Sequence, residues 1–387
     1  MDDSGCPLWL VSRSYMPDEG GIQTYAREVA HGYARLGWRV TLFVKSSAGP
    51  RRFVDEGVTV VDVGPGSKLG VYLRLCAALV RAWAGGERPR AIHACTWRAA
   101  MPALLIPVPV VVTAHGQEVA RPRGIACWAM RAVLARARRI VAVSDATRAL
   151  LVTRRPSLTH KTVRAWNGTS GFCDGAFRAR GAVGRAAPSI LTLCRLVPRK
   201  NVCSAVAAVG GCDGGDRPLR YVVAGRGPEA GHVATAIRAH RGDAAIDQAG
   251  FVADDQVPGM YSAADIFLHP QIALENGSEV EGFGLVIADA MASGLTCIVG
   301  RDGGPSELIE HGVTGLVVDG TSVPHIRAAL QSLIDAPEDM RRMAAAARAW
   351  ATTHLCWTAH CRDSLAGVVS IRDAAAPAVP VAGPGYR

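Results

Sequence analysis

Two carboxylates set eight positions apart in a glycine-rich segment give the strongest chemical signal in the sequence. Glu281 opens this segment, Gly282 and Gly284 follow it, and Asp289 lies about two helical turns further along. A carboxylate can accept hydrogen bonds from two neighbouring sugar hydroxyls, and the unpaired amides at the start of a helix near Gly284 can bind phosphate. The spacing therefore predicts that one segment, Glu281–Gly294, holds both ends of a sugar nucleotide.

Two cations follow the apolar run Ile190–Cys194 and suit the phosphates of such a molecule. Arg195 and Lys200 lie five positions apart on a predicted strand-to-helix loop. A guanidinium and an ammonium held there can bind a pyrophosphate, although the same pair could be two solvated loop cations. The chain has no Asp-x-Asp pair, so we expect protein cations and helix amides to neutralise the diphosphate without a metal.

Three weaker patterns also fall at the ends of predicted strands. Gly20 and Gly21 precede a helical pattern, and Gly225 opens a second glycine-rich turn, so in both places the backbone can approach a ligand closely. His115 follows a buried apolar run and precedes Gly116, which places it at the expected edge of a sheet. Each pattern also has an ordinary structural interpretation, a tight turn for the glycines and a satisfied polar contact for the histidine.

The elements that must position these residues alternate between short apolar runs and helical patterns. Such alternation predicts an α/β fold in which parallel sheets are covered on both faces. Doubly wound sheets bind ligands at the carboxyl ends of their strands, so two facing domains of this kind would enclose a ligand cleft. The expected strands are Leu8–Val11, Val40–Val44, Val58–Val63, Ala91–Ala94, Val108–Thr113, Ile140–Val143, Ile190–Cys194, Tyr221–Ala224, Ile266–His269 and Thr296–Val299. The expected helices are Ile22–Leu36, Val71–Trp83, Ile125–Arg138, Asp145–Val152, Asn201–Val209, Val257–Ala263, Leu285–Ser293, Val323–Ile334, Glu338–Ala351 and Thr353–Val369.

Composition and charge divide the chain into two bodies. Of the 387 residues 49% are apolar and 20% are charged, so each half can bury a core of its own. Residues 1–187 contain 27 Lys and Arg against 12 Asp and Glu, a formal charge of +15, whereas residues 188–387 carry −5. We predict an N-terminal domain over 1–187 and a nucleotide-sugar-binding domain over 188–352. A helix over 353–370 is expected to pack back on the N-terminal domain, and a disordered tail over 371–387 to follow it.

Several classes of protein are excluded by what the sequence lacks. It has no run of 18 apolar residues and no basic segment before its first apolar run, so we expect neither a membrane span nor a secretory signal, and a cytoplasmic protein. The 11 Cys form no Cys-x-x-Cys pair, which argues against a disulfide framework or a zinc ribbon, and no metal site is predicted. The net charge of +10 is not accompanied by any nucleic-acid-binding motif, so no nucleic acid is expected as a partner.

With these motifs in this order, the chain resembles the glycosyltransferases of family 4, which have the GT-B architecture of two facing Rossmann-like domains. The resemblance runs from about Leu8 to about Val369. It is carried by Glu19–Ile22, His115 with Gly116, Val143–Asp145, Asn167 with Gly168, Arg195 with Lys200, Gly225–Pro228, Gly250–Val252 and Glu281–Gly294.

The resemblance implies where a nucleotide diphosphate sugar binds. The diphosphate would lie against Gly20 and Gly21 and against the cations Arg195 and Lys200. Asp289 would bind the ribose. Glu281 and His115 are implied as the catalytic residues, Glu281 beside the donor sugar and His115 between that sugar and the acceptor. The other implied donor-binding residues are Gly225, Phe251, Val252, Phe283, Gly284 and Leu285.

Two positions depart from the family pattern without removing a charge. Asp289 stands where the family has Glu, so its carboxylate reaches one methylene less far, and Asn201 follows Lys200 where Gly is usual. Neither change argues against an active enzyme.

The resemblance also implies retaining transfer of a hexosyl group, with a UDP-sugar as the favoured co-substrate and with no cofactor. The acidic loop Gln271–Gly284, and a composition like that of aminoglycoside-producing actinomycetes, favour a small aminocyclitol or aminoglycoside acceptor bound on the side of the N-terminal domain. The alternative is a lipid-linked or phosphoinositol-type acceptor, reached by peripheral membrane contact through the basic segment Arg121–Arg139. A third interpretation is an inactive paralogue that binds a nucleotide sugar without turnover.

Overall fold

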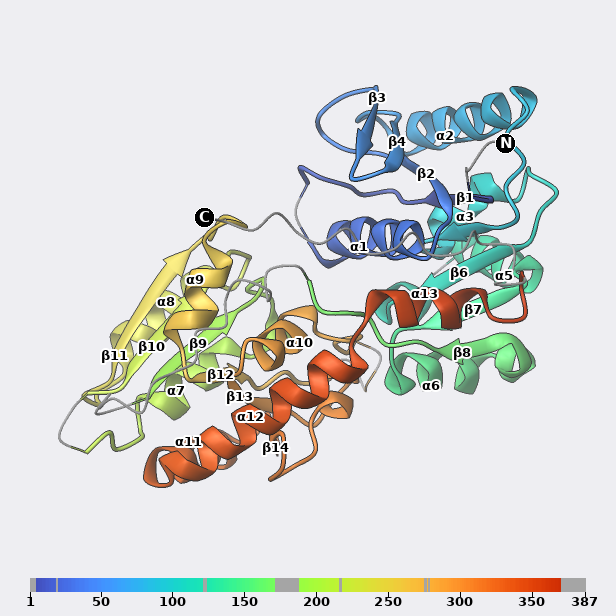
Figure 1. The fold of residues 1–387 in the computed structure, drawn as a ribbon. Helices are drawn as coiled ribbons and strands as arrows, with labels where there is room; N and C mark the ends of the chain where they lie inside the picture. The colour runs from blue at the N-terminus through green and yellow to red at the C-terminus, as the bar shows by residue number, and fades with distance from the viewer. Residues whose placement is uncertain are drawn as a thin grey trace, which may run out of the picture.

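Two α/β bodies make up the chain in the computed structural model, which describes residues 5–18, 20–120, 124–170, 188–215, 218–274, 277 and 279–369 (Figure 1). The boundary predicted near residue 187 and the tail predicted over 371–387 lie outside these residues. Each body contains a largely parallel sheet with helices on both faces. The predicted pair of doubly wound α/β domains is confirmed.

The N-terminal sheet has eight strands in the order β3-β4-β2-β1-β5-β6-β7-β8, and only the β3–β4 pair is antiparallel. Along its central strand, Leu8 and Leu10 enter one core while Trp9 and Val11 enter the other, so the sheet is buried on both faces. Its strands are β1 (Pro7–Val11), β2 (Arg39–Val44), β3 (Arg51–Asp55), β4 (Val58–Asp62), β5 (Ile92–Ala94), β6 (Val110–Ala114), β7 (Arg139–Ala142) and β8 (Thr162–Arg164).

One layer of helices covers each face of this sheet. The helix α1 (Gly21–Arg35) lies on the face of Leu8 and Leu10 and buries Tyr25 and Val29 there. The opposite face, which carries Trp9, is covered by three helices. These are α2 (Lys68–Ala84), α3 (Trp97–Ala103) and α5 (Ile125–Arg136); α4 (Gln117–Ala120), α6 (Asp145–Arg154) and the 3₁₀ helix η1 (Pro156–Lys161) complete the domain.

The C-terminal sheet has six parallel strands in the order β11-β10-β9-β12-β13-β14. Its strands are β9 (Ser189–Leu193), β10 (Arg220–Ala224), β11 (Ala245–Gly250), β12 (Ile266–His269), β13 (Thr296–Gly300) and β14 (Gly315–Val318). Its helices are α7 (Val202–Val209), α8 (Ala230–Ala239), α9 (Val257–Ala263), α10 (Leu285–Ala292), α11 (Val323–Asp335) and α12 (Pro337–His354), with the 3₁₀ helices η3 (Pro198–Lys200) and η4 (Gly304–Leu308). The strand order changes direction beside β9, which places the loops after β9 and β12 at a point where such sheets bind ligands.

After α12 the chain returns to the N-terminal domain and forms α13 (Trp357–Leu365) against α1 (Figure 1). The approach is close, because a Cβ at Gly32 of α1 would lie 2.8 Å from Sγ of Cys361. The returning segment also touches the forward connection between the domains. The indole of Trp357 donates to the carbonyl of Thr169 at 2.8 Å, and the Thr169 amide donates to the carbonyl of Leu355 at 3.3 Å.

A buried chain of hydrogen bonds ties α13 to the N-terminal sheet. Its links are Tyr33 Oη to His93 Nδ1 (2.8 Å), His93 Nε2 to Thr113 Oγ1 (2.7 Å), Thr113 Oγ1 to Tyr25 Oη (2.7 Å) and Tyr25 Oη to His360 Nε2 (2.8 Å). At its end His360 Nδ1 lies 3.1 Å from the carbonyl oxygen of Trp166. The chain therefore joins α1, β5, β6 and α13 to the start of the connection between the domains.

Candidate functional site

Glu281 and Lys200 meet at the carboxyl edge of the C-terminal sheet. Lys200 ends η3, after β9, and its Nζ lies 2.9 Å from Oε2 of Glu281. Nε of Arg199 lies 3.1 Å from the same oxygen. The Lys200 and Glu281 side chains expose only 7% and 14% of their surface, so this is a largely buried ion cluster. Within the described residues, Oε1 of Glu281 has no such partner.

The cluster keeps Glu281 ionised. Burial alone would raise the pKa of its carboxyl, but the charges of Lys200 and Arg199 outweigh burial and lower that pKa to about 2. Beneath the cluster lies His269, the last residue of β12, whose Nε2 is 3.3 Å from Nζ of Lys200. Burial, and then the charge of Lys200, hold the pKa of His269 well below its usual value, so the ring is neutral. Sequence reasoning found neither Arg199 nor His269.

His115 lies on the facing edge of the N-terminal domain, directly after β6. Its Nε2 is 2.8 Å from the carbonyl oxygen of Cys95, and because a carbonyl only accepts, Nε2 carries a proton. The ring packs edge-on against Tyr25 of α1, with 4.6 Å between the ring centroids. Nδ1 is thus the nitrogen left for a ligand, and the ring is oriented by two neighbouring elements.

The two predicted catalytic residues face each other through Gly282. A Cβ at Gly282 would overlap the carbonyl oxygen of His115, so only glycine allows this approach between the domains. The hydroxyl of Thr147 lies 3.5 Å from the carbonyl oxygen of Gly282 and supports the same contact. The structure therefore brings the segment of His115 in one domain into contact with the segment of Glu281 in the other.

Two helix N-termini meet at this contact between the domains. The helix α1 starts at Gly21 and α10 starts at Leu285, and neither has a side chain that caps its first amides. A Cβ at Gly21 would lie 3.9 Å from the Leu285 side chain, so the two ends are neighbours. Uncapped helix N-termini attract anions, and a diphosphate could span the pair. Gly284, with a φ of 86°, supplies the left-handed turn before α10, while Phe283 beside it is buried.

The other predicted donor residues lie on the loops of the C-terminal domain. Arg195 is exposed and, among the described residues, its guanidinium has no ion pair. Gly225, after β10, packs so closely on the carbonyl of Cys194 that a Cβ would overlap it, so its glycine serves the contact between two loops. Phe251 is 51% exposed, with the guanidinium of Arg226 4.7 Å from its ring centroid, and Val252 beside it is half-buried.

Asp289 lies on the buried side of α10 and is 4% exposed. Its Oδ1 accepts from the amide of Ser170 at 2.7 Å and its Oδ2 from the Ser170 hydroxyl at 2.6 Å. Ser170 belongs to the forward connection between the domains. The structure thus gives this carboxylate a partner that sequence reasoning did not identify, and its binding of ribose stays a prediction.

A carboxylate from the C-terminal domain also holds the N-terminal domain. Glu307 in η4 accepts from the amide of Asp145 at 2.8 Å and from the amide of Ala146 at 2.6 Å. These are the first amides of α6, where a negative charge is stabilised by the helix dipole. The contact fixes the two cleft walls relative to each other.

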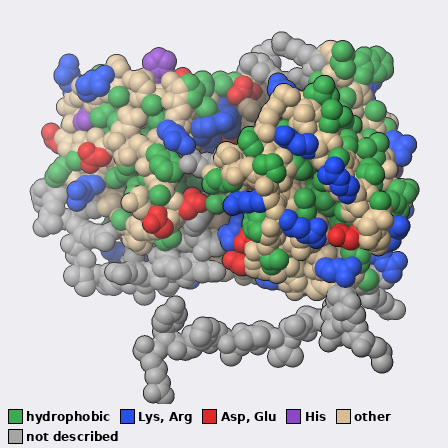
Figure 2. All heavy atoms as spheres, turned by 90° about the horizontal axis from the view of Figure 1, so that it is seen from above, with side chains coloured by type: hydrophobic (Ala, Val, Ile, Leu, Met, Phe, Trp, Pro, Cys, Tyr) green, Lys and Arg blue, Asp and Glu red, His purple; other side chains and the backbone are tan. Residues whose placement is uncertain are grey.

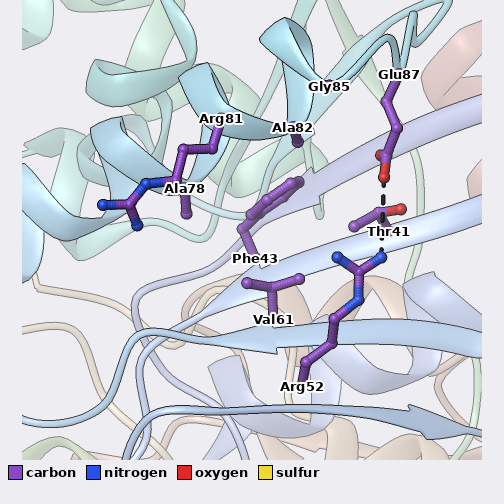
Figure 3. Close-up of a pocket in the computed structure, with 9 residues that line it drawn as sticks. All are labelled: Thr41, Phe43, Arg52, Val61, Ala78, Arg81, Ala82, Gly85 and Glu87. Atoms are coloured by element: carbon purple, nitrogen blue, oxygen red, sulfur yellow. Dashed lines mark ion pairs between the residues drawn. The ribbon is translucent and has the colours of Figure 1, made fainter.

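A separate cavity of about 330 Å³ lies away from the cleft, between α2 and the strands β2 to β4 (Figure 3). Phe43 and Val61 form its floor, and Arg52 lies 3.8 Å from Glu87 at its rim. None of the predicted site residues lines it. Among the described residues, no group of three or more His, Cys, Asp or Glu side chains is arranged to hold a metal ion.

Two family models match the chain in succession. The model of the glycosyl transferase 4-like domain matches residues 20–163, and the model of glycosyl transferases group 1 matches residues 177–350. The first match falls within the N-terminal body and the second covers most of the C-terminal one, including Lys200 and Glu281.

Relatives of known activity include two kinds of transferase. The chain is 29% identical, over 378 residues, to the GDP-mannose-dependent alpha-(1-6)-phosphatidylinositol monomannoside mannosyltransferase of Mycobacterium tuberculosis, with 90% of this chain and 94% of the relative covered. It is 26% identical, over 260 residues, to the alpha-D-kanosaminyltransferase of Streptomyces kanamyceticus, with 62% and 65% covered. Among solved structures, sucrose-phosphate synthase from Thermosynechococcus elongatus has a similar fold, with a TM-score of 0.74, 18% identity, and 92% of this chain and 97% of that one covered.

Proposed function

Because the chain is a glycosyltransferase of the GT-B fold, we propose that it transfers a hexosyl group from a nucleotide sugar, with retention of configuration, to a polyol acceptor of the phosphoinositol type. The observation that supports this proposal is the contact between the domains. The ionised Glu281 and the Lys200 cation lie on one side of it, His115 lies on the other, and two uncapped helix N-termini meet beside it. The mannosyltransferase relative, which uses GDP-mannose, makes that donor the first to test.

The donor diphosphate binds between the N-termini of α1 and α10, with Lys200 and Arg195 on the side of the C-terminal domain. As the bond between the anomeric carbon and the phosphate oxygen breaks, negative charge grows on that oxygen. Fixed amides and cations stabilise such charge without having to reorganise. We expect turnover to continue after chelation. Loss of turnover with a chelator, restored by a divalent ion, would show that a metal ion stabilises the charge on the departing phosphate oxygen.

Glu281 orients the donor sugar and His115 the reacting hydroxyls. Among the described residues, both cation contacts of Glu281 are made by Oε2, so Oε1 is the oxygen that faces sugar hydroxyls. The acceptor hydroxyl approaches on the face from which the nucleotide leaves. Its oxygen bonds to the anomeric carbon, and its proton passes to the departing phosphate oxygen. Glu281 therefore acts through hydrogen bonds and ionic stabilisation and forms no covalent intermediate.

Exposed apolar and basic side chains on the N-terminal domain support a lipid-borne acceptor. On α5, Ile125 and Trp128 are 88% and 72% exposed, and the guanidinium of Arg131 lies 5.6 Å from the Trp128 ring centroid. On α2, Leu69 and Leu73 are 66% and 56% exposed. Many Lys and Arg side chains also lie on the N-terminal half in Figure 2. Such a surface suits an anionic membrane. Of the predicted basic segment, residues 121–123 lie outside the described residues.

The membrane contact needs no spanning segment. None of the described helices combines the length and apolar character needed to cross a bilayer. We expect the protein to sediment with vesicles that contain anionic lipid and to stay in the supernatant with neutral vesicles. Trp128→Ser should reduce this binding, whereas Trp350→Ser on α12, in the other domain, should not. Equal binding by wild type and Trp128→Ser would show that α5 does not contribute to the membrane contact.

A second candidate is transfer from a UDP-sugar to an aminocyclitol or aminoglycoside. The kanosaminyltransferase relative favours it. However, the acidic loop that suggested a cationic acceptor is partly neutralised, because Glu279 and Glu281 face Arg199 at 3.9 Å and 3.1 Å. Glu275 of that loop lies outside the described residues.

One donor-by-acceptor screen separates the candidates. GDP-mannose and UDP-sugars are each incubated with phosphatidylinositol, inositol and an aminocyclitol, and product and nucleotide release are measured. The proposal predicts turnover with an inositol-type acceptor. Turnover only with the aminocyclitol would replace it by the second candidate. Donor binding without any turnover or hydrolysis across the screen would identify an inactive paralogue.

A further inference from the structure

Two arginines follow neighbouring central strands of the N-terminal sheet. Val11 at the end of β1 pairs with Ala94 at the end of β5, and the amide of Cys95 donates to the carbonyl of Val11 at 2.9 Å. Arg13 comes two residues after Val11, and Arg98 four residues after Ala94. Both therefore lie at the carboxyl edge of the same pair of strands, which is the edge that faces the cleft.

Arg13 and Arg98 follow hydrogen-bonded strand ends, and in the described part of the chain neither guanidinium has an acidic partner. Partial burial, and then the charge of Arg98, lower the pKa of Arg13. Arg98 lies over the Trp97 ring, with its guanidinium carbon 4.4 Å from the ring centroid. Among the described residues, neither arginine is in an ion pair. Holding two like charges together costs free energy that a bound anion would offset.

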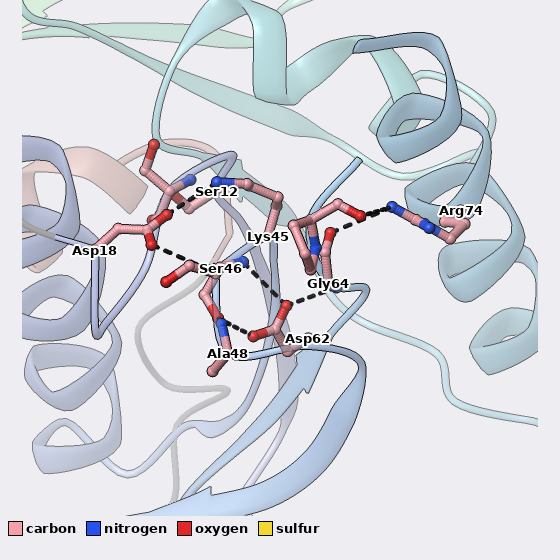
Figure 4. Close-up of polar contacts among 11 residues, drawn as sticks. Ser12, Asp18, Lys45, Ser46, Ala48, Asp62, Gly64 and Arg74 are labelled. Atoms are coloured by element: carbon pink, nitrogen blue, oxygen red, sulfur yellow. Dashed lines mark hydrogen bonds and ion pairs between the residues drawn. The ribbon is translucent and has the colours of Figure 1, made fainter. Parts of the chain in front are cut away.

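Three described carboxylates of the N-terminal domain are engaged by groups other than these arginines. Asp18 lies 2.9 Å from Nζ of Lys45, and Asp62 accepts from the amides of Ser46 and Gly64 at 3.0 Å and 2.8 Å (Figure 4). A third, Glu118, accepts from the backbone amide of His115. These three carboxylates thus bind groups of their own loops, while Glu19 lies outside the described residues.

The arginine pair lies beside the reacting centre. The carbonyl of Cys95, which receives Nε2–H of His115, is three residues before Arg98. The Cys95 amide also donates a hydrogen bond to the carbonyl of Val11, which lies two residues before Arg13. The pair is therefore on the His115 wall of the cleft, whereas Lys200 and Arg195, the cations assigned to the donor, belong to the C-terminal domain.

We propose that Arg13 and Arg98 form a subsite for a phosphate group carried by the acceptor. This inference rests on the proposed function and adds that the acceptor is anionic next to the hydroxyl that reacts. Two planar guanidiniums can each give paired hydrogen bonds to phosphate oxygens, and they hold the polyol so that one hydroxyl points toward His115. A lipid phosphodiester and a free sugar-alcohol phosphate both present this group.

The first test measures binding. Titration calorimetry with inositol 1-phosphate, in the presence of the nucleoside diphosphate, compares wild type with Arg13→Gln, Arg98→Gln and the double variant. We expect each single change to weaken binding about 10-fold and the double change about 100-fold, as for charge-assisted hydrogen bonds. Arg90→Gln is the matched control, because this exposed arginine precedes β5 at the opposite edge of the sheet. Equal binding by wild type and the double variant, or no binding by either, overturns the proposal.

The second test measures turnover and distinguishes the sources of the phosphate. Inositol, inositol 1-phosphate and phosphatidylinositol in phosphatidylcholine vesicles are used as acceptors. The double variant should raise KM for the phosphorylated acceptors and leave that for inositol unchanged, while donor binding stays at the wild-type level. The phosphorylated acceptor whose KM rises more identifies the source of the phosphate group. An equal rise for all three would mean that the arginines only shape the cleft.

The two tests also separate this inference from the proposed function. Phosphate-dependent binding that the double variant loses, without turnover of any inositol acceptor, supports the subsite and contradicts the proposed function. Turnover of an inositol acceptor at an unchanged KM in the double variant supports the function and contradicts the subsite.

Discussion

The Glu281 carboxylate illustrates how single side chains define the chemistry of the cleft. Lys200 and Arg199 both approach Oε2, and their charges keep the pKa near 2 despite burial. The depressed pKa means that this ion cluster stabilises the fold fully above the ordinary pKa of a glutamate, about 4.3, and loses that contribution as the pH falls towards 2. A fall in activity between pH 4 and 6 must therefore come from another group.

Removal of the cations assigned to the donor should slow the reaction. Lys200→Ala and Arg195→Ala each remove a charge assigned to the leaving diphosphate, and we expect Lys200→Ala to lower turnover about 100-fold or more, with some loss of stability because it removes one partner of a buried ion pair. Steady-state kinetics with saturating donor measure the effect, and thermal unfolding checks the fold. Arg238→Ala on α8, an exposed arginine, is the control. Near-wild-type turnover in both cleft variants would refute the assignment of the donor site.

Substitutions at Glu281 and Asp289 should change different kinetic parameters. Glu281→Gln should lower kcat about 100-fold and change nucleotide diphosphate binding little, because Glu281 is assigned to the reacting sugar. Asp289→Asn should instead raise the KM of the donor several-fold. Asparagine can keep both contacts with Ser170, accepting from its amide and donating to its hydroxyl, so the fold should survive. Identical effects of the two changes on kcat and KM would show that these roles are not separate.

The sequence predicted site residues that stand in recognisable motifs and missed neighbours that depend on the tertiary fold. Lys200 was predicted from its place after a strand and Glu281 from its glycine-rich segment, and the structure places them 2.9 Å apart. Arg199, His269 and Ser170 were missed because nothing in the sequence brings them near a carboxylate. Each makes its contact across at least 69 positions of chain. Contacts between residues so far apart in the chain can be identified only when the tertiary fold is known.

At the scale of elements, the buried hydrogen-bond chain has a single direction. Its last acceptors are the carbonyls of Ala165 and Trp166, so His360 must donate from Nδ1 and accept at Nε2. Tyr25 then donates to His360 and accepts from Thr113, and the same logic gives His93 a proton on Nε2. Each neutral histidine thus has one tautomer, and α13 is held by the side chains of α1 and by the backbone of the connection.

The attachment of α13 should weaken in mild acid. Burial lowers the pKa of His360 to about 4, although the carbonyls of Trp166 and Ala165 raise it in part. Because the unfolded chain takes up this proton at about pH 6.5, the stability contribution is complete above pH 6.5 and declines as the pH falls towards 4. His360→Phe should lower the free energy of unfolding by about 1–3 kcal/mol at pH 7.5 and flatten this pH dependence.

Denaturant unfolding at several pH values between 4 and 8 measures both effects. His354→Phe is the matched control, because His354 is exposed at the end of α12. A wild-type pH dependence in His360→Phe would exclude His360 as its source.

The elements that sequence patterns predicted are those with continuous apolar faces. Central strands such as β1 and β6 are buried on both sides and were found within a residue or two of their observed ends. The missed strands β3, β8, β11 and β14 lie at or next to sheet edges. In β3, for example, the pattern begins with exposed Arg51 and Arg52, because its pairing with β4 alone holds it in place. The helix α3 was missed because Pro102 lies inside it.

At the scale of the whole molecule, two small contacts are among those that join the facing edges of the domains. Gly282 admits the carbonyl of His115, and Glu307 accepts the first amides of α6. Both belong to segments that follow β12 and β13, so the carboxyl edge of one sheet is held directly against the facing edge of the other. Opening the cleft for substrate must break these contacts, and closure must form them again.

Removing the carboxylate of Glu307 should shift the molecule towards an open form. The two hydrogen bonds to Asp145 and Ala146 involve a charged acceptor and contribute on the order of 2 kcal/mol, which corresponds to a roughly 30-fold change in the ratio of closed to open forms. Small-angle scattering of Glu307→Ala should give a larger radius of gyration than that of wild type, with lower kcat. Glu310→Ala, at an exposed neighbouring position, is the control. An unchanged radius in Glu307→Ala would show that other contacts determine closure.

The return of α13 to the N-terminal domain has a consequence for the order in which the protein forms during synthesis. His360, the partner of Tyr25, leaves the ribosome 335 residues after it. Domains generally fold as they emerge, but here the first domain must wait with the α13 face of α1 uncovered until the second domain has been made. The uncovered face of α1 would therefore be accessible to chaperones that bind exposed apolar segments while the C-terminal domain is being translated. The cleft is therefore completed in one late step, when the last described helix docks on the first.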